Sequence, residues 1–314
     1  MTKSKATLSK LTPKQLLNQQ QSKLVDELIE LMRKGRNPWQ RPWNPTNATH
    51  QNLDTGKAYS GSNIPLLDIY MAARGYSMPL WIGASQARKY KLHPAKGSKG
   101  CYIKRPFLMS YEKETKEREE KVLISYTNYK LVPVFNAQDL TGDEQNKEEL
   151  ISRFVLPTDK PPLEKIQACE DVIRTYHKTQ GIETRWGGDR CYYSPSEDYI
   201  GMAKKEQFKT KEVYYAVHLH ELGHSTGHHK RLNRSMKGSK GSATYAREEL
   251  IAELTSTMCC RRLGISSNLE NHASYLQSWI SVLSDDPEIL FKSLTKASKA
   301  VELILGKDKE VETS

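Results

Sequence analysis

The chain has 314 residues, of which 37% are hydrophobic, enough for two ordinary domains or one large one. No run of about 18 apolar residues occurs, so we expect no membrane-spanning helix, and the basic, polar start argues against a secretory signal. The five cysteines form no CxxC pair, which excludes a disulfide framework or a cysteine zinc ribbon and favours reduced thiols in the cytoplasm.

Positive charge is concentrated in the first third of the chain. The net charge is +11, but residues 1–110 hold 18 Lys and Arg against 5 Asp and Glu, a net +13. Residues 111–314 hold 30 against 32, a net −2. This segregation favours a polyanionic partner for the first third.

In chain order, a polar start at 1–12, expected to be disordered, precedes helices, a proline-rich loop and two strands. The loop is NPWQRPWNPTNATH, in which three prolines prevent regular structure. Alternating β-branched and aromatic residues predict the strands, and a charged hairpin tip joins them. The expected elements are helices at 12–36, 62–74 and about 84–90, and strands at 101–112 and 121–135.

The polar segment 141–162, which ends in Pro-Pro, is expected to link two domains, residues 1–140 and 163–314. In the second domain, periodicity predicts several helices around short strands. We therefore expect an α+β protein with a small mixed α/β N-terminal domain. The expected elements after the linker are helices at 163–179, 205–228, 244–263, 267–283 and 287–306, and strands at 183–186, 190–194 and 198–203.

The stretch VHLHELGHSTGHH contains five of the nine histidines of the chain, and it includes the sequence H-E-x-x-H. On a helix, His220 and His224 are four residues apart and share a face, so both imidazoles can bind one Zn²⁺. Glu221 projects to the side, where it can accept a proton from water at the metal. We therefore expect a zinc site with Glu221 as its catalytic base.

A catalytic zinc needs a third protein ligand. His228 is eight residues after His220, about 12 Å further along a straight helix, so it reaches the same ion only if the helix stops and folds back. A metzincin pattern would need a histidine where the chain has Lys230, which excludes that class. We expect His218 and His229 to take no part and His228 to lie beside the site.

The remaining candidates for the third ligand are acidic residues in TYAREELIAEL. A glutamate on a following helix completes the His₂Glu arrangement of gluzincin-type enzymes. Glu249 and Glu253 share a helix face, so we expect Glu249 to bind the metal and Glu253 to orient a ligand histidine, with the reverse as the alternative. Glu248 is expected to face solvent. The strand at 198–203 is a candidate edge strand for an extended peptide substrate, or else plain sheet core.

Aromatic and basic residues alternate through the first third. Cations can follow the phosphates of single-stranded nucleic acid while aromatic rings stack on its bases, with little sequence preference. Many of these aromatics are expected to be core residues instead. The candidate DNA-binding residues are Trp39, Arg41, Trp43, Tyr59, Trp81, Lys96, Lys99, Lys104 and Arg105.

The chain resembles the ArdC family of antirestriction proteins, whose N-terminal domain is also found in conjugative TraC-type primases. The resemblance rests on NPWQRPWNP, TGKAYSGSNIPLL, PLWIGASQARKYKLHPAKGSKG, YYSPSEDYIGMAKKEQF, HELGHSTGHHKRLNR and YAREELIAEL. It implies an N-terminal domain that binds single-stranded DNA, fused to a zincin-like metallopeptidase domain, here expected as the stand-alone form without a primase domain. It also implies a role on plasmids and in conjugation, shielding incoming single-stranded DNA from restriction.

Two alternatives remain at this point. In the first, the protein protects single-stranded DNA without catalysis, and zinc only stabilises the C-terminal domain. In the second, the protein is a sequence-specific regulator that binds duplex DNA, although no recognition-helix pattern supports it.

Overall fold

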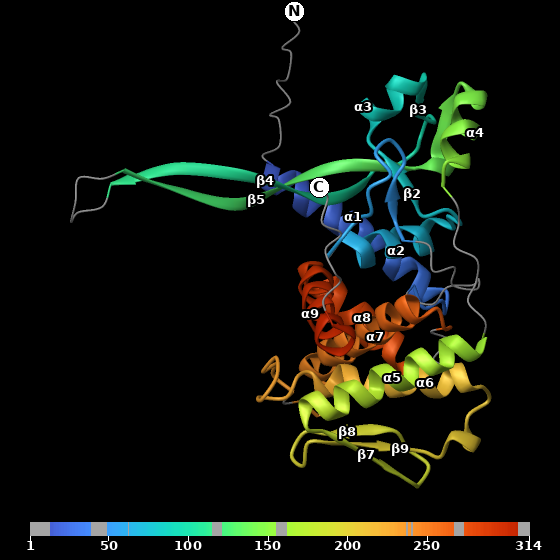
Figure 1. Ribbon diagram of the computed structural model, residues 1–314, viewed down its shortest axis with the longest axis vertical. Helices are drawn as coiled ribbons and strands as arrows, with labels where there is room; N and C mark the ends of the chain where they lie inside the picture. The colour runs from blue at the N-terminus through green and yellow to red at the C-terminus, as the bar shows by residue number, and fades with distance from the viewer. Residues whose placement is uncertain are drawn as a thin grey trace, which may run out of the picture. The chain divides into compact units, whose positions relative to one another are not determined.

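The computed structural model describes residues 13–38, 49–61, 63–114, 121–154, 162–236, 238–239, 241–266 and 273–306. Its helices and sheets confirm the predicted α+β class (Figure 1). Its contacts divide the chain into two compact units. Unit 1 combines residues 1–48, 68–75 and 156–314, and unit 2 combines residues 49–67 and 76–155. Among the described residues, no helix has the length and apolar character needed to span a membrane.

Unit 2 is built on a four-stranded sheet in the order β1-β2-β5-β4. β1 and β2 are parallel, the other neighbours are antiparallel, and β3 pairs with β6 in a separate small sheet. Its elements are β1 (Gln51–Asn52), β2 (Leu80–Ile82), α3 (Ala84–Ala87), η1 (Arg88–Tyr90), β3 (Leu92–Pro94), β4 (Cys101–Glu114), β5 (Lys121–Asn136), η2 (Ala137–Asp139), β6 (Leu140–Gly142) and α4 (Glu144–Ser152).

The predicted linker 141–162 is largely folded, so that prediction is wrong for its first two-thirds. Asp143 caps α4 by accepting a hydrogen bond from the Asn146 backbone N–H. Leu150 of α4 is fully buried in the apolar core of unit 2, beside residues of β2, β3 and β6. The polar composition of the segment concealed a helix that buries only one narrow face. Residues 155–161 lie outside the described part of the chain.

β4 and β5 form an antiparallel ribbon whose register runs from Cys101↔Val134 to Glu114↔Lys121. The ribbon continues well past the other elements of unit 2 (Figure 1). Its base contributes Ile103 and Val134 to the core, whereas its outer part carries exposed side chains. The hairpin tip expected around residues 115–120 lies outside the described residues.

Unit 1 consists of helices around a three-stranded sheet with the order β7-β9-β8. Its first helix, α1, packs against α8 and α9 rather than within the predicted domain of residues 1–140. Helix α2 (Asn63–Arg74) begins in unit 2 and ends in unit 1. The other elements of unit 1 are α1 (Pro13–Arg33), α5 (Pro162–Gln180), β7 (Glu183–Trp186), β8 (Tyr192–Ser194), β9 (Tyr199–Met202), η3 (Lys205–Gln207), α6 (Lys211–Ser225), α7 (Ala243–Leu263), α8 (Ala273–Asp285) and α9 (Glu288–Leu305).

The histidine-bearing helix is shorter than predicted at both ends. Thr210 caps α6 by accepting a hydrogen bond from the Val213 backbone N–H, so the helix begins at Lys211 rather than near 205. It ends at Ser225, after which the chain folds back through turns. α7 matches its prediction closely because Ser242 caps its start and Gly264, with φ +73°, ends it in the left-handed conformation.

Candidate metal centre

Close packing of α6 on α7 builds the centre. Gly223 of α6 faces Ala252 of α7, and a Cβ at this glycine would lie 3.2 Å from the Ala252 Cα. A larger residue at 223 would push the two backbones apart. The glycine within HELGH therefore allows the histidines of α6 to reach the carboxylates of α7.

His220 and His224 direct their Nε2 atoms at the same carboxylate. The His220 Nε2 lies 3.6 Å from one oxygen of Glu249, and the His224 Nε2 lies 3.4 Å from the other. The ligand atoms of these three residues all lie within 4.8 Å of one another. The structure thus brings together the two predicted histidines and Glu249 rather than Glu253.

The opposite nitrogen of each histidine faces a further glutamate of α7. The Glu253 carboxylate lies 3.6 Å from the His220 Nδ1, and the Glu248 carboxylate lies 3.5 Å from the His224 Nδ1. Both glutamates are buried. A carboxylate behind a ligand histidine fixes the orientation of the ring and makes its other nitrogen a better donor. Glu253 thus lies behind His220, at a distance longer than a hydrogen bond, and its supporting role stays a prediction.

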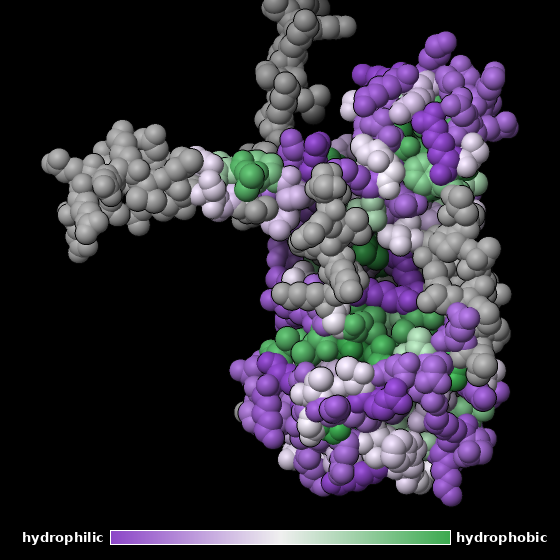
Figure 2. All heavy atoms as spheres, viewed as in Figure 1, coloured by the Kyte–Doolittle hydropathy of each residue, from purple (hydrophilic) through white to green (hydrophobic). Residues whose placement is uncertain are grey.

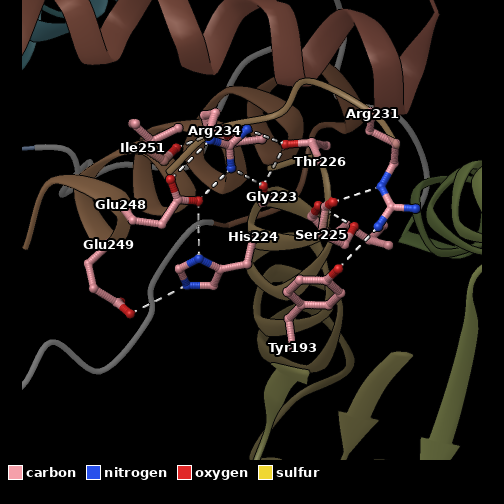
Figure 3. A network of polar contacts seen from close by, with 12 residues as sticks. Tyr193, Gly223, His224, Ser225, Thr226, Arg231, Arg234, Glu248, Glu249 and Ile251 are labelled. Atoms are coloured by element: carbon pink, nitrogen blue, oxygen red, sulfur yellow. Dashed lines mark hydrogen bonds and ion pairs between the residues drawn. The ribbon is translucent and has the colours of Figure 1, made fainter. Parts of the chain in front are cut away.

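Glu248 does not face solvent, so that expectation is wrong. Arg234 makes a two-pronged contact with its carboxylate, at 2.5 Å to Oε1 and 3.0 Å to Oε2 (Figure 3). The same guanidinium donates to the Thr226 hydroxyl at 2.7 Å and to the Gly223 carbonyl at 2.8 Å. The chain that folds back after α6 thereby holds Glu248 against His224.

A residue from the other end of the sequence completes the support. The Asn37 side-chain amide donates to Glu253 Oε1 at 3.2 Å, and both residues are buried. Asn37 follows α1 and begins the proline-rich NPWQRPW stretch. The sequence predicted nothing for this residue. The one available signal was its position in that stretch, close after the glycine that ends α1.

The geometry of the three converging side chains fits a tetrahedral metal ion. Metal–nitrogen and metal–oxygen bonds of about 2.0–2.2 Å place two ligand atoms of a tetrahedron roughly 3.3–3.6 Å apart. The His220 and His224 separations of 3.6 and 3.4 Å, each to a different oxygen of Glu249, fall in this range. Two imidazoles and one carboxylate also leave a fourth position for water or substrate. His220, His224 and Glu249 therefore form a donor set suited to a divalent metal.

Glu221 lies beside this donor set and is also buried. Burial raises the pKa of its carboxyl group above the ordinary value, although the neighbouring histidines act in the opposite direction. The Tyr193 backbone of β8 acts on the same carboxyl group and slightly lowers this pKa. A buried carboxylate with a raised pKa is suited to taking up a proton near neutral pH.

The other histidines stay outside the cluster. The helix does stop before His228, but this residue lies 3.4 Å from an oxygen of Asp198 instead of joining the metal ligands. Asp198 also forms an ion pair with the buried Arg231 and accepts a hydrogen bond from the Tyr193 hydroxyl. His218 is fully buried beside Thr184, 3.1 Å from its hydroxyl.

The predicted edge strand at 198–203 is a central strand. β9 pairs with β7 on one side and with β8 on the other, so its backbone hydrogen bonds are already used. β8, which contacts α6 and reaches Glu221 through Tyr193, is an edge strand among the described strands. An extended peptide beside the metal ligands would therefore align with β8 rather than with β9.

The predicted DNA-binding residues fall into four groups. Trp81 is wrong as a stacking residue because it is fully buried and donates a hydrogen bond to His50 at 2.9 Å. Tyr59 is half-buried, and its hydroxyl accepts a hydrogen bond from Asn52 at 3.1 Å. The exposed residues are Lys96, Lys99, Lys104 and Arg105, while Trp39, Arg41 and Trp43 lie outside the described residues.

Comparison with known proteins places both parts of the chain. Residues 18–154 match the N-terminal domain of anti-restriction factor ArdC, and residues 171–296 match a zincin-like metallopeptidase family. The crystal structure of the antirestriction ArdC protein from the R388 plasmid, in its metal-free form, superposes with a TM-score of 0.62. The two chains are 31% identical, and the match covers 90% of this chain and 96% of the other.

The chain belongs to the ArdC family of antirestriction proteins. The Mn(II)-bound structure of the R388 protein is similar to it as well, with a TM-score of 0.61. Two further relatives are a DNA primase TraC of Escherichia coli, 33% identical over 305 residues, and protein y4eC of Sinorhizobium fredii, 29% identical over 288 residues. The match with TraC covers 90% of this chain but only 27% of TraC. The match with y4eC covers 88% of this chain and 88% of y4eC.

We predict that Glu248→Gln weakens metal binding by this ArdC-family chain about 10- to 100-fold, because His224 loses the charged partner that orients it. Titration with Mn²⁺, followed by electron paramagnetic resonance, measures the affinity. Glu206→Gln, at an exposed position in η3, is the matched control and is expected to leave affinity unchanged. An unchanged affinity in Glu248→Gln would contradict the orienting role.

We also predict that metal affinity rises with pH up to about pH 9. Burial alone lowers the pKa of His224, but Glu248 and Glu249 outweigh it and raise the pKa from 6.5 to about 9. A metal must therefore displace a proton at neutral pH. In the metal-free protein the same proton contributes stability that is complete below about pH 6.5 and lost as pH rises through 9.

Calorimetric metal titrations between pH 6 and 9, in buffers of different ionisation enthalpy, measure the protons released. Proton release at pH 7 that decreases as the pH approaches 9, where His224 loses its proton, is the expected result. An affinity independent of pH across this interval would contradict the raised pKa.

Proposed function

We propose that the chain is an antirestriction protein that binds single-stranded DNA in the cytoplasm and carries a zinc-dependent peptidase. The convergence of His220, His224 and Glu249 beside the buried Glu221 is the observation that carries the peptidase half. The conjugative TraC relatives and the R388 plasmid protein support a role on mobile DNA. Five free cysteines, four of them buried, are compatible with a reducing compartment.

In the proposed reaction, His220, His224 and Glu249 hold Zn²⁺. When bound, the metal supplies Lewis acidity towards a scissile carbonyl and increases the acidity of water. Glu221 accepts the proton of the attacking water and delivers it to the leaving amine, a role that its raised pKa favours. The peptide aligns with the free edge of β8, whose Tyr193 backbone lies beside Glu221.

The alternative is a protein that protects DNA without catalysis and uses its metal as a structural element. The deep burial of the three glutamates of α7 favours this reading, since a metal there also neutralises buried charge. Glu221 distinguishes the two functions. A peptidase needs Glu221 for hydrolysis, whereas a protein with a structural metal does not need it to hold the metal.

We predict that Glu221→Gln lowers peptide hydrolysis by at least about a hundredfold and leaves metal affinity within about twofold, because the proton acceptor is lost while the ligands remain. Cleavage of an unstructured protein such as casein, analysed by mass spectrometry, is the measurement. Glu206→Gln is again the control. Retained hydrolysis in Glu221→Gln would contradict the peptidase assignment.

The DNA half rests on the charge of the first third and on the exposed cations Lys96, Lys99, Lys104 and Arg105. Lys96 and Lys99 flank Gly97, whose φ of +92° allows a tight basic turn. Cations without a fixed base-reading element favour binding through phosphates, with little sequence preference. The two predicted tryptophans of the 39–48 stretch remain candidates for stacking.

We predict that the protein binds a single-stranded oligonucleotide more tightly than the duplex of the same length, because stacking requires exposed base faces. Competition measured by fluorescence anisotropy between 50 and 300 mM salt tests this. Affinity should fall steeply with salt for both forms. A preference for duplex would contradict the proposal.

A further inference from the structure

The outer part of the β4–β5 ribbon has two distinct faces. Side chains alternate between the faces along each strand, and residues paired across the ribbon share a face. Figure 2 shows apolar side chains on the ribbon next to more hydrophilic ones. The register defines two faces. The Arg105 face consists of Arg105, Phe107, Met109, Tyr126, Asn128 and Lys130, and the Lys104 face includes Lys104, Pro106, Leu108, Tyr129 and Leu131.

The Arg105 face carries a pair of cations directly opposite one another. Arg105 and Lys130 are register partners, and both are exposed. Neither forms an ion pair with any other residue in the part of the chain that the structure describes. Like charges at opposed positions destabilise a strand pair. An anion bound between the two side chains would turn this repulsion into attraction, so the pair is suited to a phosphate.

Two aromatic rings follow the cations along the same face. Phe107 lies next to Arg105 on this face, and the Lys130 ammonium is 6.0 Å from its ring centroid. Tyr126 comes one step further out and is 43% exposed. Successive positions on one face are about 6.6–6.8 Å apart, comparable with the distance between nucleotides in an extended strand. The cation pair and the two rings therefore follow one another along this face at a spacing similar to that between successive nucleotides.

Polar groups lie among the rings. The Asn128 amide contacts the Met109 sulfur at 3.3 Å, and the Tyr126 hydroxyl contacts the same sulfur at 3.6 Å. These contacts hold exposed side chains in place on the ribbon. Rings that are already positioned lose less conformational freedom when a base stacks on them.

We propose that the Arg105 face of the β4–β5 ribbon is a binding surface for single-stranded DNA, with a phosphate between Arg105 and Lys130 and bases on Phe107 and Tyr126. The inference rests on the proposed single-stranded DNA binding and assigns part of it to this face. A second copy of the chain fits this face less well. If two copies docked through their Arg105 faces, Arg105 and Lys130 of both copies, four cations in all, would be buried without partners.

The first test removes the cation pair. Arg105→Gln/Lys130→Gln should weaken binding of a labelled oligothymidylate at least fivefold. The slope of log affinity against log salt should also become shallower by roughly 0.7, which corresponds to one phosphate that is no longer neutralised. The control is Lys296→Gln/Lys299→Gln, which removes the same charge from exposed positions on α9 and should change neither quantity.

The second test compares two tyrosines on opposite faces. Tyr126→Ser should weaken binding roughly 5- to 150-fold through lost stacking. Tyr129→Ser should leave binding unchanged, even though Tyr129 is the more exposed ring at 59%. Circular dichroism and thermal melting of each variant, compared with the unmodified protein, verify that the ribbon is folded.

The possible outcomes separate this inference from the proposed function. If the unmodified protein does not bind single-stranded DNA, the proposed function fails. If it binds and both Arg105-face variants bind equally well, the DNA function stands and the ribbon assignment is overturned. A loss in Tyr129→Ser but not in Tyr126→Ser overturns the choice of face. A change in sedimentation instead of DNA affinity identifies the ribbon as a contact between copies of the chain and overturns the inference.

Discussion

Buried charge must be balanced, and this requirement governs the centre between α6 and α7. Helix α7 brings three buried glutamates to one place, and Arg234 neutralises one of these negative charges. Removing two uncompensated carboxylates from water would cost several kcal/mol each. The two remaining negative charges can be matched by protons on the two histidines or by one divalent cation. The same side chains therefore support a folded metal-free state and a metal-bound state of equal net charge.

The sequence predicts those residues of the centre whose relative positions are determined by helical geometry. Residues four apart on one helix share a face in any fold, so His220 and His224 could be paired from spacing alone. Glu249 was also reachable, because a second helix with a suitably placed carboxylate is a common way to complete such a site. Its preference over Glu253 depended on the rotation of α7, which spacing does not determine.

The features that the sequence did not predict depend on contacts between segments that are far apart in the sequence, or on a chain that folds back on itself. Glu248 can lie on the buried side of α7 because Arg234 donates two hydrogen bonds to its carboxylate. Trp81 occurs in a basic, aromatic stretch that resembles a nucleic-acid surface, yet its register in β2 places it in the core. The composition of a segment shows which kinds of interaction its side chains can make, but only the fold determines which side chains are exposed and can make them.

The hydrogen bond between Asn37 and Glu253 joins residues 216 positions apart. During synthesis, Asn37 leaves the ribosome long before Glu253 has been made. Helix α1 likewise forms long before α8 and α9, which follow all the other described helices in the sequence. At an elongation rate of about 5–20 residues per second, this interval is roughly 10–40 seconds. In that interval α1 lacks its contacts with α8 and α9, and the apolar surface that these helices cover is open to chaperones or to aggregation. Unit 2, whose residues all lie before 156, is complete earlier and does not need this delayed step.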